Sequence, residues 1–322
     1  MIAAVICARA DSARLPNKVL ADVGGRSVLA SIVSRLRRAA CVTSIIVATS
    51  EEASDNAIAV EAARLNLPCY RGSKNDVVAR MDGAVRRYAT GFKHVFRAMS
   101  DQPFLDWAGL DEAARLMEIK DWDIVLPLSF GQDPVYGAGL SPWSKRAWSA
   151  IVADSRGEER EHVGMWLRRN LKRFEYGLLD LPHWCFRPYR LELDTEEDLT
   201  LVRAVSAPWA AGDPQLRAVV ALLDRTPELV AMNAGVAEKT GTYTSYTVAE
   251  VAQWESDYRG REVVFSDLPS LEADLRAGQT RATRCETCGG LLMPTKVRDG
   301  DLKLKCTRCG RQATFYADKR PA

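Results

Sequence analysis

The sequence predicts an α/β protein with a mainly parallel sheet and helices on both faces. Short apolar runs, typical of strands buried on both faces, lie at 2–7, 44–48, 94–97 and 123–127. Segments with helical spacing of their apolar residues lie between these runs, one at 27–40 after the first run and two, at 54–65 and 76–88, between the second and the third. Strands that alternate with helices in this way imply crossover connections and therefore parallel pairing.

Each predicted element has a local reason. Residues 2–7 are small or β-branched and carry no charge, as a central strand requires. The helix at 27–40 ends in three arginines, which suit the negative end of the helix macrodipole. Further elements are predicted by the same periodicities: a short strand at 69–70, an alternating segment at 189–193, and helices at 143–153, 213–223 and 226–237.

Composition limits the classes of function. The chain has 44 Lys plus Arg against 42 Asp plus Glu, a net charge of +2, so no global basic field recruits nucleic acid or a membrane. No apolar run approaches the ~20 residues that span a bilayer. The start of the chain lacks the pattern of a secretory signal. We therefore expect a cytoplasmic protein without a membrane partner.

The domain organisation follows from length and composition. At 322 residues the chain can bury one large core plus a small module. We predict an α/β domain over 1–239, a linker with helical segments over 240–280, and a small module over 281–322. The linker begins where the sequence becomes polar and rich in Thr, Ser and Tyr, and Thr247 and Glu250 have capping-box spacing.

Two Cys-x-x-Cys pairs near the end predict a structural zinc ribbon. Seventeen residues separate the pairs, and Asp299-Gly300 between them favours a hairpin turn. Four thiolates close the coordination shell of Zn²⁺, so the site is structural and not catalytic. The ribbon is locally basic, which suits a protein, a nucleic acid or a glycan carrier as partner, or simply a solvated face. The predicted ligands are Cys285, Cys288, Cys306 and Cys309.

The loop after the first strand predicts an anion site. Arg9, Arg14 and Lys18 follow the strand at what would be the carboxyl edge of an open sheet, where ligands bind. The loop has neither a dinucleotide fingerprint nor a P-loop. Small residues let backbone N–H groups approach an anion, and a triphosphate would fit. The alternative is a solvated basic turn. The small residues are Ala8, Ala10, Ser12 and Ala13.

Three carboxylates are expected at the same edge. Asp101 follows the strand at 94–97, and an extended 189–193 would place Glu192 and Asp194 on one face. Carboxylates at one edge can hold a hard divalent cation against phosphate oxygens, which implies magnesium. The alternative readings are a turn-forming Asp before Pro103 and an acidic helix start at 195–198.

The segment Arg9-Ala-Asp-Ser-Ala-Arg-Leu-Pro-Asn-Lys18 resembles the signature loop of the cytidylyltransferases that activate acidic sugars as CMP-sugars. It is most similar to the SpsF-type branch, and similar also to the CMP-KDO and CMP-sialate synthetases. Four later segments match in order, at 70–80, 97–104, 161–163 and 190–199. The resemblance covers 1–239 and implies a glycosyltransferase-A-like nucleotidyltransferase fold. It does not extend to the last 80 or so residues.

The resemblance implies a reaction and a set of roles. A sugar hydroxyl would attack the α-phosphorus of CTP and release pyrophosphate, with magnesium at Asp101, Glu192 and Asp194. The implied catalytic residues are Arg9, Arg14, Lys18, Asp101 and Asp194. The implied nucleotide contacts are Ala8, Ala10, Ser12, Arg71, Gly72, Ser73, Asp76 and Arg97. The implied sugar contacts are Gln102, Glu161 and His162.

The chain departs from the pattern of this family in three places. Gln102 replaces a common Cys and Gly164 a common Thr, and these two departures leave the identity of the sugar open. Glu192 replaces a frequent Asp, which makes its role in metal binding less certain than that of Asp101 and Asp194. The family also implies a homodimer. Two alternatives to a CTP-dependent enzyme remain: transfer of another nucleotide, and a nucleotide-binding adaptor that docks through the ribbon.

Overall fold

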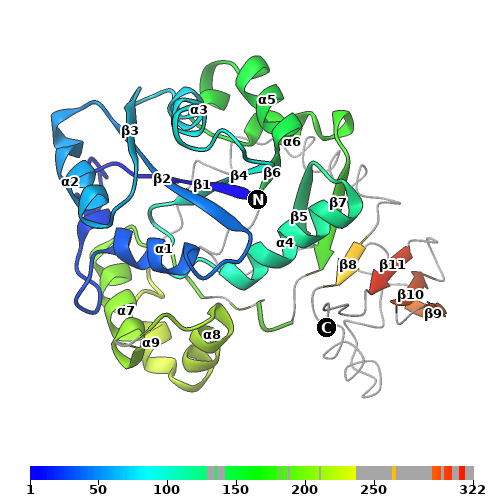
Figure 1. The fold of residues 1–322 in the computed structure, drawn as a ribbon. Helices are drawn as coiled ribbons and strands as arrows, with labels where there is room; N and C mark the ends of the chain where they lie inside the picture. Colours follow the sequence, from blue (N-terminus) through cyan, green and yellow to red (C-terminus); the bar gives the residue numbers. More distant parts are fainter. Residues whose placement is uncertain are drawn as a thin grey trace.

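A mostly parallel sheet forms the centre of the computed structural model, as Figure 1 shows. Its strands run in the order β3-β2-β1-β4-β6-β5-β7, and β6 alone in this set pairs antiparallel with both neighbours. The structure describes residues 1–128, 135, 142–180, 183–185, 187, 189–209, 212–236, 263–265, 292–298, 301–306 and 312–315. The bounds of these strands are β1 (Ile2–Cys7), β2 (Val42–Ser50), β3 (Cys69–Gly72), β4 (His94–Met99), β5 (Ile124–Leu128), β6 (Trp143–Ser144) and β7 (Tyr176–Asp180).

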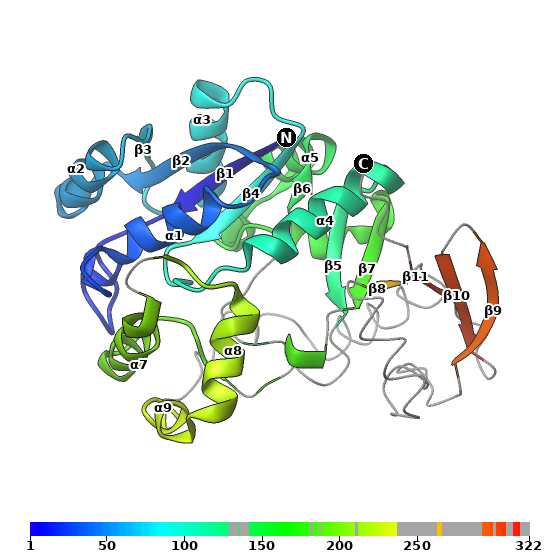
Figure 2. The same cartoon turned by 60° about the horizontal axis from the view of Figure 1, so that its bottom comes forward.

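Helices cover both faces of the sheet, so the predicted fold class is confirmed. On one face lie α1 (Val28–Leu36), α2 (Asn56–Arg64) and α4 (Trp107–Lys120). On the other lie α3 (Val77–Tyr88), α5 (Lys145–Asp154) and α6 (Met165–Arg169). Three further helices, α7 (Glu196–Ser206), α8 (Leu216–Arg225) and α9 (Pro227–Ala231), gather below the first face, as the turned view in Figure 2 shows.

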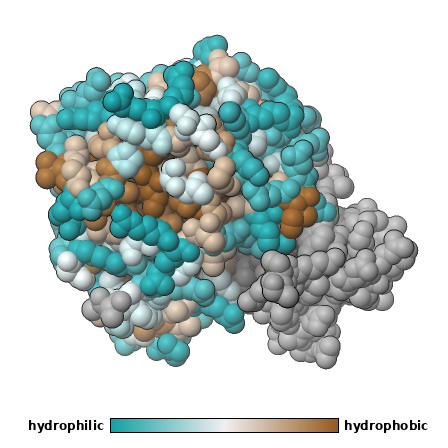
Figure 3. All heavy atoms as spheres, viewed as in Figure 1, coloured by the Kyte–Doolittle hydropathy of each residue, from teal (hydrophilic) through white to brown (hydrophobic). Residues whose placement is uncertain are grey.

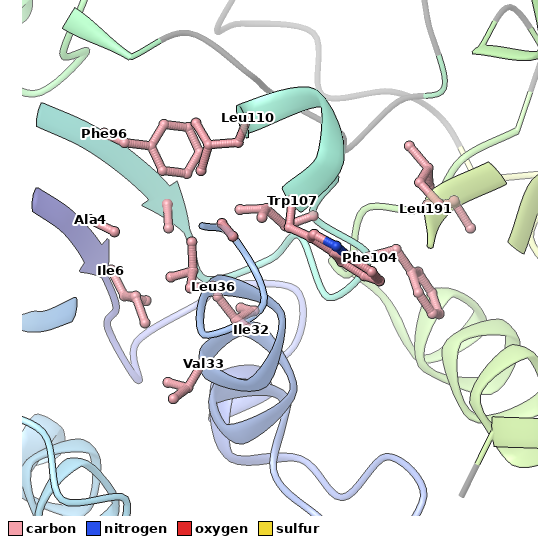
Figure 4. Packing of buried hydrophobic residues seen from close by; sticks show 14 of the residues in the cluster. Ala4, Ile6, Ile32, Val33, Leu36, Phe96, Phe104, Trp107, Leu110 and Leu191 are labelled. Atoms are coloured by element: carbon pink, nitrogen blue, oxygen red, sulfur yellow. The ribbon is translucent and has the colours of Figure 1, made fainter. Parts of the chain in front are cut away.

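The central strand β1 contributes to both cores, as its apolar sequence predicts. Ile2, Ala4 and Ile6 pack on the side of α1 and α4, and Ala3 and Val5 pack on the side of α3 and α5. Figure 4 shows the first of these cores, where side chains of β1 and β4 meet those of α1 and α4. We call the two sides the α1 face and the α3 face. This packing fixes the carboxyl ends of β1 and β4 side by side.

Four parts of the prediction need comment. The segment at 189–193 lies outside the named strands, although Leu191 and Leu193 are buried in the α1-face core. The predicted helix at 226–237 is shorter, since α9 ends at Ala231. Helix α4 and strand β7 were not among the predicted elements. The glycine at 177 interrupts the apolar pattern of β7, and Trp122 packs against it, so that a Cβ there would lie 2.0 Å from the ring.

The C-terminal region contributes four strands that continue the sheet beyond β7, in the order β8-β11-β10-β9. Their bounds are β8 (Val263–Phe265), β9 (Leu292–Arg298), β10 (Asp301–Cys306) and β11 (Gln312–Phe315). Strands β9 and β10 pair antiparallel across residues 299–300, where the sequence predicts the hairpin turn. Strand β8 lies in the segment predicted as a linker. Residues 285, 288 and 309, and the side chain of Cys306, lie outside the described part, so the zinc site stays a prediction.

Among the described residues, no helix is both long and apolar enough to cross a membrane. Hydrophilic side chains cover much of the face in Figure 3, with a smaller apolar area among them.

Candidate active site

The loop after β1 is held in place by its own backbone. The N–H of Ala8 donates to the carbonyl of Ala48, and the N–H of Ala10 donates to Asp55 Oδ1 at 2.7 Å. Asn17 has a left-handed φ of 58° and leads into the 3-10 turn Lys18–Leu20. The amides of Ala8 and Ala10 are therefore engaged within the protein, whereas the sequence predicts that they approach an anion.

Lys18 is the residue that joins the loop to the predicted acidic positions. Its ammonium lies 3.0 Å from Asp101 Oδ2 and 2.6 Å from Asp194 Oδ1, and it also donates to the carbonyl of Leu193 at 2.9 Å. Burial opposes the charge on Lys18, but the two carboxylates outweigh it and raise the pKa of the ammonium. The structure thus brings three of the five predicted catalytic residues together in a buried ion-pair cluster.

Asp194 is the centre of a larger network. Arg14 Nη2 lies 2.8 Å from Asp194 Oδ2, and Arg190 approaches both Asp194, at 3.5 Å, and Glu192, at 3.6 Å. The side chain of Asp194 is fully buried, while that of Arg14 is 35% exposed. Arg14 can therefore keep its partner and still present part of its guanidinium to a ligand at the surface.

The network behind Asp194 depends on Asp198 and Asn233. Asp198 Oδ2 accepts the backbone N–H of Asp194 at 2.9 Å, and Asp198 Oδ1 accepts from Arg190 and from Asn233 Nδ2. Thr195 and Asp198 also form the capping box that starts α7. The start of this helix thus fixes the backbone position of Asp194.

The sequence does not single out Arg190, Asp198 or Asn233 as site residues. One available signal is the alternation Arg190-Leu-Glu192-Leu-Asp194, which puts a cation on the same side as the two acids. No local signal points to Asn233, because it follows α9 and reaches Asp198 from 35 residues away.

The predicted three-carboxylate magnesium site is only partly formed. No group of three or more His, Cys, Asp or Glu side chains within the described residues is arranged to hold a metal. Lys18 lies between Asp101 and Asp194, and Glu192 faces Arg190. Asp101 Oδ1, however, is buried without a hydrogen-bond partner in the described part of the chain. An Asp101–Asp194 pair with one spare oxygen fits a divalent cation whose remaining ligands are phosphate oxygens.

Arg9 lies apart from the ion-pair cluster of Lys18, Asp101 and Asp194, which we call the Lys18 cluster. Its guanidinium donates to the carbonyl of Lys74 at 3.3 Å and approaches Asp11 at 3.5 Å. Lys74 in turn lies 2.7 Å from Asp11, which lowers the pKa of this carboxyl, mainly through that hydrogen bond. Arg9 therefore links the β1 loop to the segment before α3. Ser12, in the same loop, is half-buried.

The predicted nucleotide segment at 71–76 lies at the carboxyl end of β3. Arg71 donates to Ser50 O, Asn56 Oδ1 and Glu52 O, so its guanidinium fastens the β2–α2 connection. Gly72 is buried, and a Cβ there would lie 2.9 Å from the ring of Tyr70. Ser73 Oγ accepts the N–H of Asp76, which caps α3 by accepting from Ala79. Most of these groups fix the shape of the segment.

The predicted sugar segment lies against the start of α3. Arg160 Nε is 2.6 Å from Asp76 Oδ2 and thereby joins the segment at 157–164 to the nucleotide segment. Glu161 is exposed and His162 half-buried. Gly164 has a φ of +97°, and a Cβ there would lie 3.2 Å from the Trp143 ring, which explains why Thr does not occur at this position. The third predicted sugar contact, Gln102, is also half-buried and directly follows Asp101 in the loop after β4.

A basic loop at the carboxyl edge of a mainly parallel sheet, meeting buried aspartates of two other segments, is an arrangement that suits a nucleotidyltransferase. Comparison with known proteins agrees with this interpretation. Residues 3–134 match the family model described as Cytidylyltransferase.

Two relatives and one solved structure illustrate the match. An uncharacterised protein of Methanocaldococcus jannaschii is 27% identical over 241 residues, or 74% of this chain and 97% of the relative. The spore coat polysaccharide biosynthesis protein SpsF of Bacillus subtilis is 27% identical over 236 residues, which are 70% of this chain and 94% of that protein. A cytidylyltransferase structure from Leptospira borgpetersenii has a TM-score of 0.65 at 21% identity and covers 71% of this chain and 96% of that one. It has the same fold.

Proposed function

We propose that the protein transfers CMP from CTP to a hydroxyl of an acidic 2-keto sugar and releases pyrophosphate. The observation that carries this proposal is the contact of Lys18 with both Asp101 and Asp194. It joins the loop after β1, the loop after β4 and the segment before α7 at one point of the sheet edge. The similarity to SpsF and the resemblance to CMP-KDO synthetases support CTP as the donor and glycan synthesis as the purpose.

The cationic residues would bind the triphosphate. Arg14 and Lys18 would release part of their contact with the aspartates and donate to phosphate oxygens, with Arg9 at the other end of the loop. These charges oppose the negative charge that develops on the leaving pyrophosphate, which is the main contribution proteins make to phosphoryl transfer. Arg71, Gly72, Ser73 and Asp76 would form the wall for base and ribose.

The chemical step is an in-line displacement at the α-phosphorus. The hydroxyl oxygen of the sugar forms the new P–O bond, and the bond from the α-phosphorus to the bridging oxygen of the β-phosphate breaks. The hydroxyl proton leaves to a base on the acceptor side, for which His162 is the candidate because a neutral imidazole nitrogen can accept a proton. Gln102 and Glu161 would contact the sugar.

Asp101 and Asp194 would hold magnesium, which when bound neutralises phosphate charge. The buried, unpartnered Oδ1 of Asp101 supports this role. Glu192 supports it less, because it faces Arg190. The homodimer, the cytoplasmic location and the zinc ribbon with its unknown partner are proposed from the sequence alone.

The direct test is pyrophosphate release by the full chain with magnesium, each of the four nucleoside triphosphates, and the acidic sugars KDO and N-acetylneuraminate. Release with CTP that depends on one sugar and on magnesium is expected. Release with another triphosphate would contradict the choice of base. If CTP raises the melting temperature but neither sugar leads to pyrophosphate release, the protein binds the nucleotide as an adaptor and does not transfer CMP to these two sugars. No shift with any nucleotide would contradict the triphosphate site itself.

A further inference from the structure

Three arginines from three different elements converge at the α3 face of the sheet edge. Arg9 lies in the loop after β1, Arg80 in α3, and Arg97 in β4. Burial, together with repulsion from Arg9 and Arg97, lowers the pKa of Arg80, so the three guanidinium groups act on one another. We call these residues the arginine cluster.

The carboxylates near the cluster are already engaged. Asp55 accepts the N–H groups of Ala10 and Ser50, at 2.7 and 3.1 Å, and the hydroxyl of Ser50. Asp11 pairs with Lys74 at 2.7 Å in addition to Arg9. Asp55 also attracts Arg80, so the three arginines and Lys74 bring four positive charges against the two negative charges of Asp55 and Asp11.

Arg97 is the member of the cluster without any hydrogen bond or ion pair to the described residues, and its Nε is buried without a partner. Arg80 is 2% exposed and donates to the carbonyl of Lys74 at 3.0 Å and to that of Ser73, yet its Nε also lacks a partner. Burying guanidinium N–H groups without an acceptor is unfavourable. Such an arrangement persists where a ligand supplies the acceptor.

The position of Arg97 points to the acceptor side of the site. Along β4, Val95 packs in the core of the α3 face, and Arg97, two residues later, projects toward the same face. Val163, next to His162, packs on this core, and Arg160 ties the same segment to the start of α3. The Lys18 cluster lies on the other face, where Val19 and Leu193 are part of the α1-face core.

We propose that Arg97, backed by Arg80, binds the carboxylate of the acceptor sugar and so selects acidic over neutral sugars. The inference rests on the proposed function. A guanidinium fork matches the two oxygens of a carboxylate, which suits Arg97 and Arg80 better than a single hydroxyl. The triphosphate has Arg9, Arg14 and Lys18 at its disposal, so Arg97 and Arg80 are available for a second anion.

The test compares the full-length wild type with Arg97→Met, Arg97→Lys and a control, Arg86→Met. Arg86 lies on the exposed side of α3 and pairs only with Asp82 among the described residues. The probes are CTP, KDO, N-acetylneuraminate and the methyl esters of the two sugars. Pyrophosphate release gives kcat and KM, saturation-transfer NMR gives sugar binding in the presence of CTP, and calorimetry gives the Kd for CTP.

For Arg97→Met we expect the KM for the acid to rise about tenfold or more, as loss of a charge-assisted hydrogen bond implies. The preference for acid over ester should disappear, while the Kd for CTP stays within about twofold. Arg97→Lys should recover part of the preference, and Arg86→Met should match the wild type. Circular dichroism checks that each variant is folded. If Arg97→Met does not fold, the preference for acid over ester is compared between Arg97→Lys and the wild type.

Several results would overturn the inference. One is an unchanged preference for acid over ester in Arg97→Met. Another is a loss of CTP affinity as large as the loss of sugar affinity, which would assign Arg97 to the nucleotide phosphates. A wild type that binds CTP with magnesium but neither acid would also contradict it, while the nucleotide part of the proposed function would stand. Failure of CTP to bind would contradict the proposed function itself.

Discussion

Two charged clusters at the same sheet edge differ in how their charges are balanced. On the α1 face, Lys18 and Arg190 pair with buried carboxylates at 2.6–3.6 Å. On the α3 face, the arginine cluster includes Arg97, which has no ion pair to the described residues. The first cluster holds itself together before any ligand arrives, and the second has unsatisfied donors. Balanced charges fix geometry, and unbalanced charges provide affinity for an anion.

We call the ion-paired group of Lys18, Asp101, Asp194, Arg190, Glu192 and Asp198 the balanced cluster. The largest expected effect is that of Lys18→Met, which breaks this cluster at its centre. Removing a positioned donor that faces developing charge typically costs ~10²–10³ in rate, and we expect kcat/KM for CTP to fall by about that factor. Pyrophosphate release measures it. Lys93→Met is the control, since Lys93 is 61% exposed and pairs with Glu118 at the surface. A Lys18→Met enzyme within a few-fold of wild type would show that the lysine is only structural.

Asp198→Asn tests whether the balanced cluster also stabilises the fold. Asp198 is buried and accepts from Arg190, Asn233 and the N–H of Asp194, so losing its charge leaves a buried guanidinium poorly compensated. The free energy of unfolding should fall by about 3 kcal/mol. Urea unfolding measures it.

The control for Asp198→Asn is Asp154→Asn, which breaks an exposed pair with Arg173. We expect that change to cost less than about 1 kcal/mol, because solvent screens such pairs. Equal effects of the two substitutions would mean that the buried network contributes no more than a surface pair.

The difference between the clusters also explains what the sequence can predict. Strands β1 to β5 and helices α1 to α3 follow from apolar periodicity, which is local. The meeting of Lys18 with Asp101 follows from a general rule, because the carboxyl ends of the parallel strands β1 and β4 share an edge. Asp194 joins them from a segment outside the named strands. Sequence alone therefore gives the fold class and, within the balanced cluster, Lys18, Asp101 and Asp194, but it does not give Arg190.

The remaining features depend on tertiary packing. Asn233 reaches Asp198 only because α7, α8 and α9 pack together, and nothing near Asn233 in the sequence signals this contact. The engagement of the Ala8 and Ala10 amides depends on β2 and on Asp55, 45 residues from Ala10. Hydrogen bonds over such separations decide whether a predicted ligand group is free, and a motif does not encode that.

A smaller effect is expected from Arg160→Gln, which removes the ion pair between Arg160 and Asp76 at the start of α3. Its contact with Asp76 positions residues 157–164, so the KM for the sugar should rise about five- to twentyfold, as loss of one charged hydrogen bond implies. The Kd for CTP should change little. Steady-state kinetics with varied sugar, and calorimetry with CTP, separate the two quantities.

The matched control for Arg160→Gln is Arg173→Gln, which removes a surface pair with Asp154. If Arg160→Gln instead weakens CTP and leaves the KM for the sugar unchanged, Asp76 serves the nucleotide alone. The two sides of the site would then be independent of each other.

The smallest effect concerns His94, at the amino end of β4, opposite to the clusters. Both ring nitrogens are buried without a hydrogen-bond partner among the described residues. Burial, with repulsion from the N-terminal amine, lowers the pKa of His94 below its ordinary 6.5. The unfolded chain therefore binds the proton more tightly, and stability falls as pH drops below that value.

His94→Leu removes this titration without removing a described hydrogen bond. We expect the variant to match the wild type in urea unfolding at about pH 8 and to be the more stable of the two at about pH 5. Parallel loss of stability in both proteins would place the acid sensitivity in the buried carboxylates of the balanced cluster instead. His94 lies at the amino end of β4, and Asp101 follows its carboxyl end. If the pH profile of activity in His94→Leu is unchanged, the charge on His94 does not affect the residues at the other end of the strand.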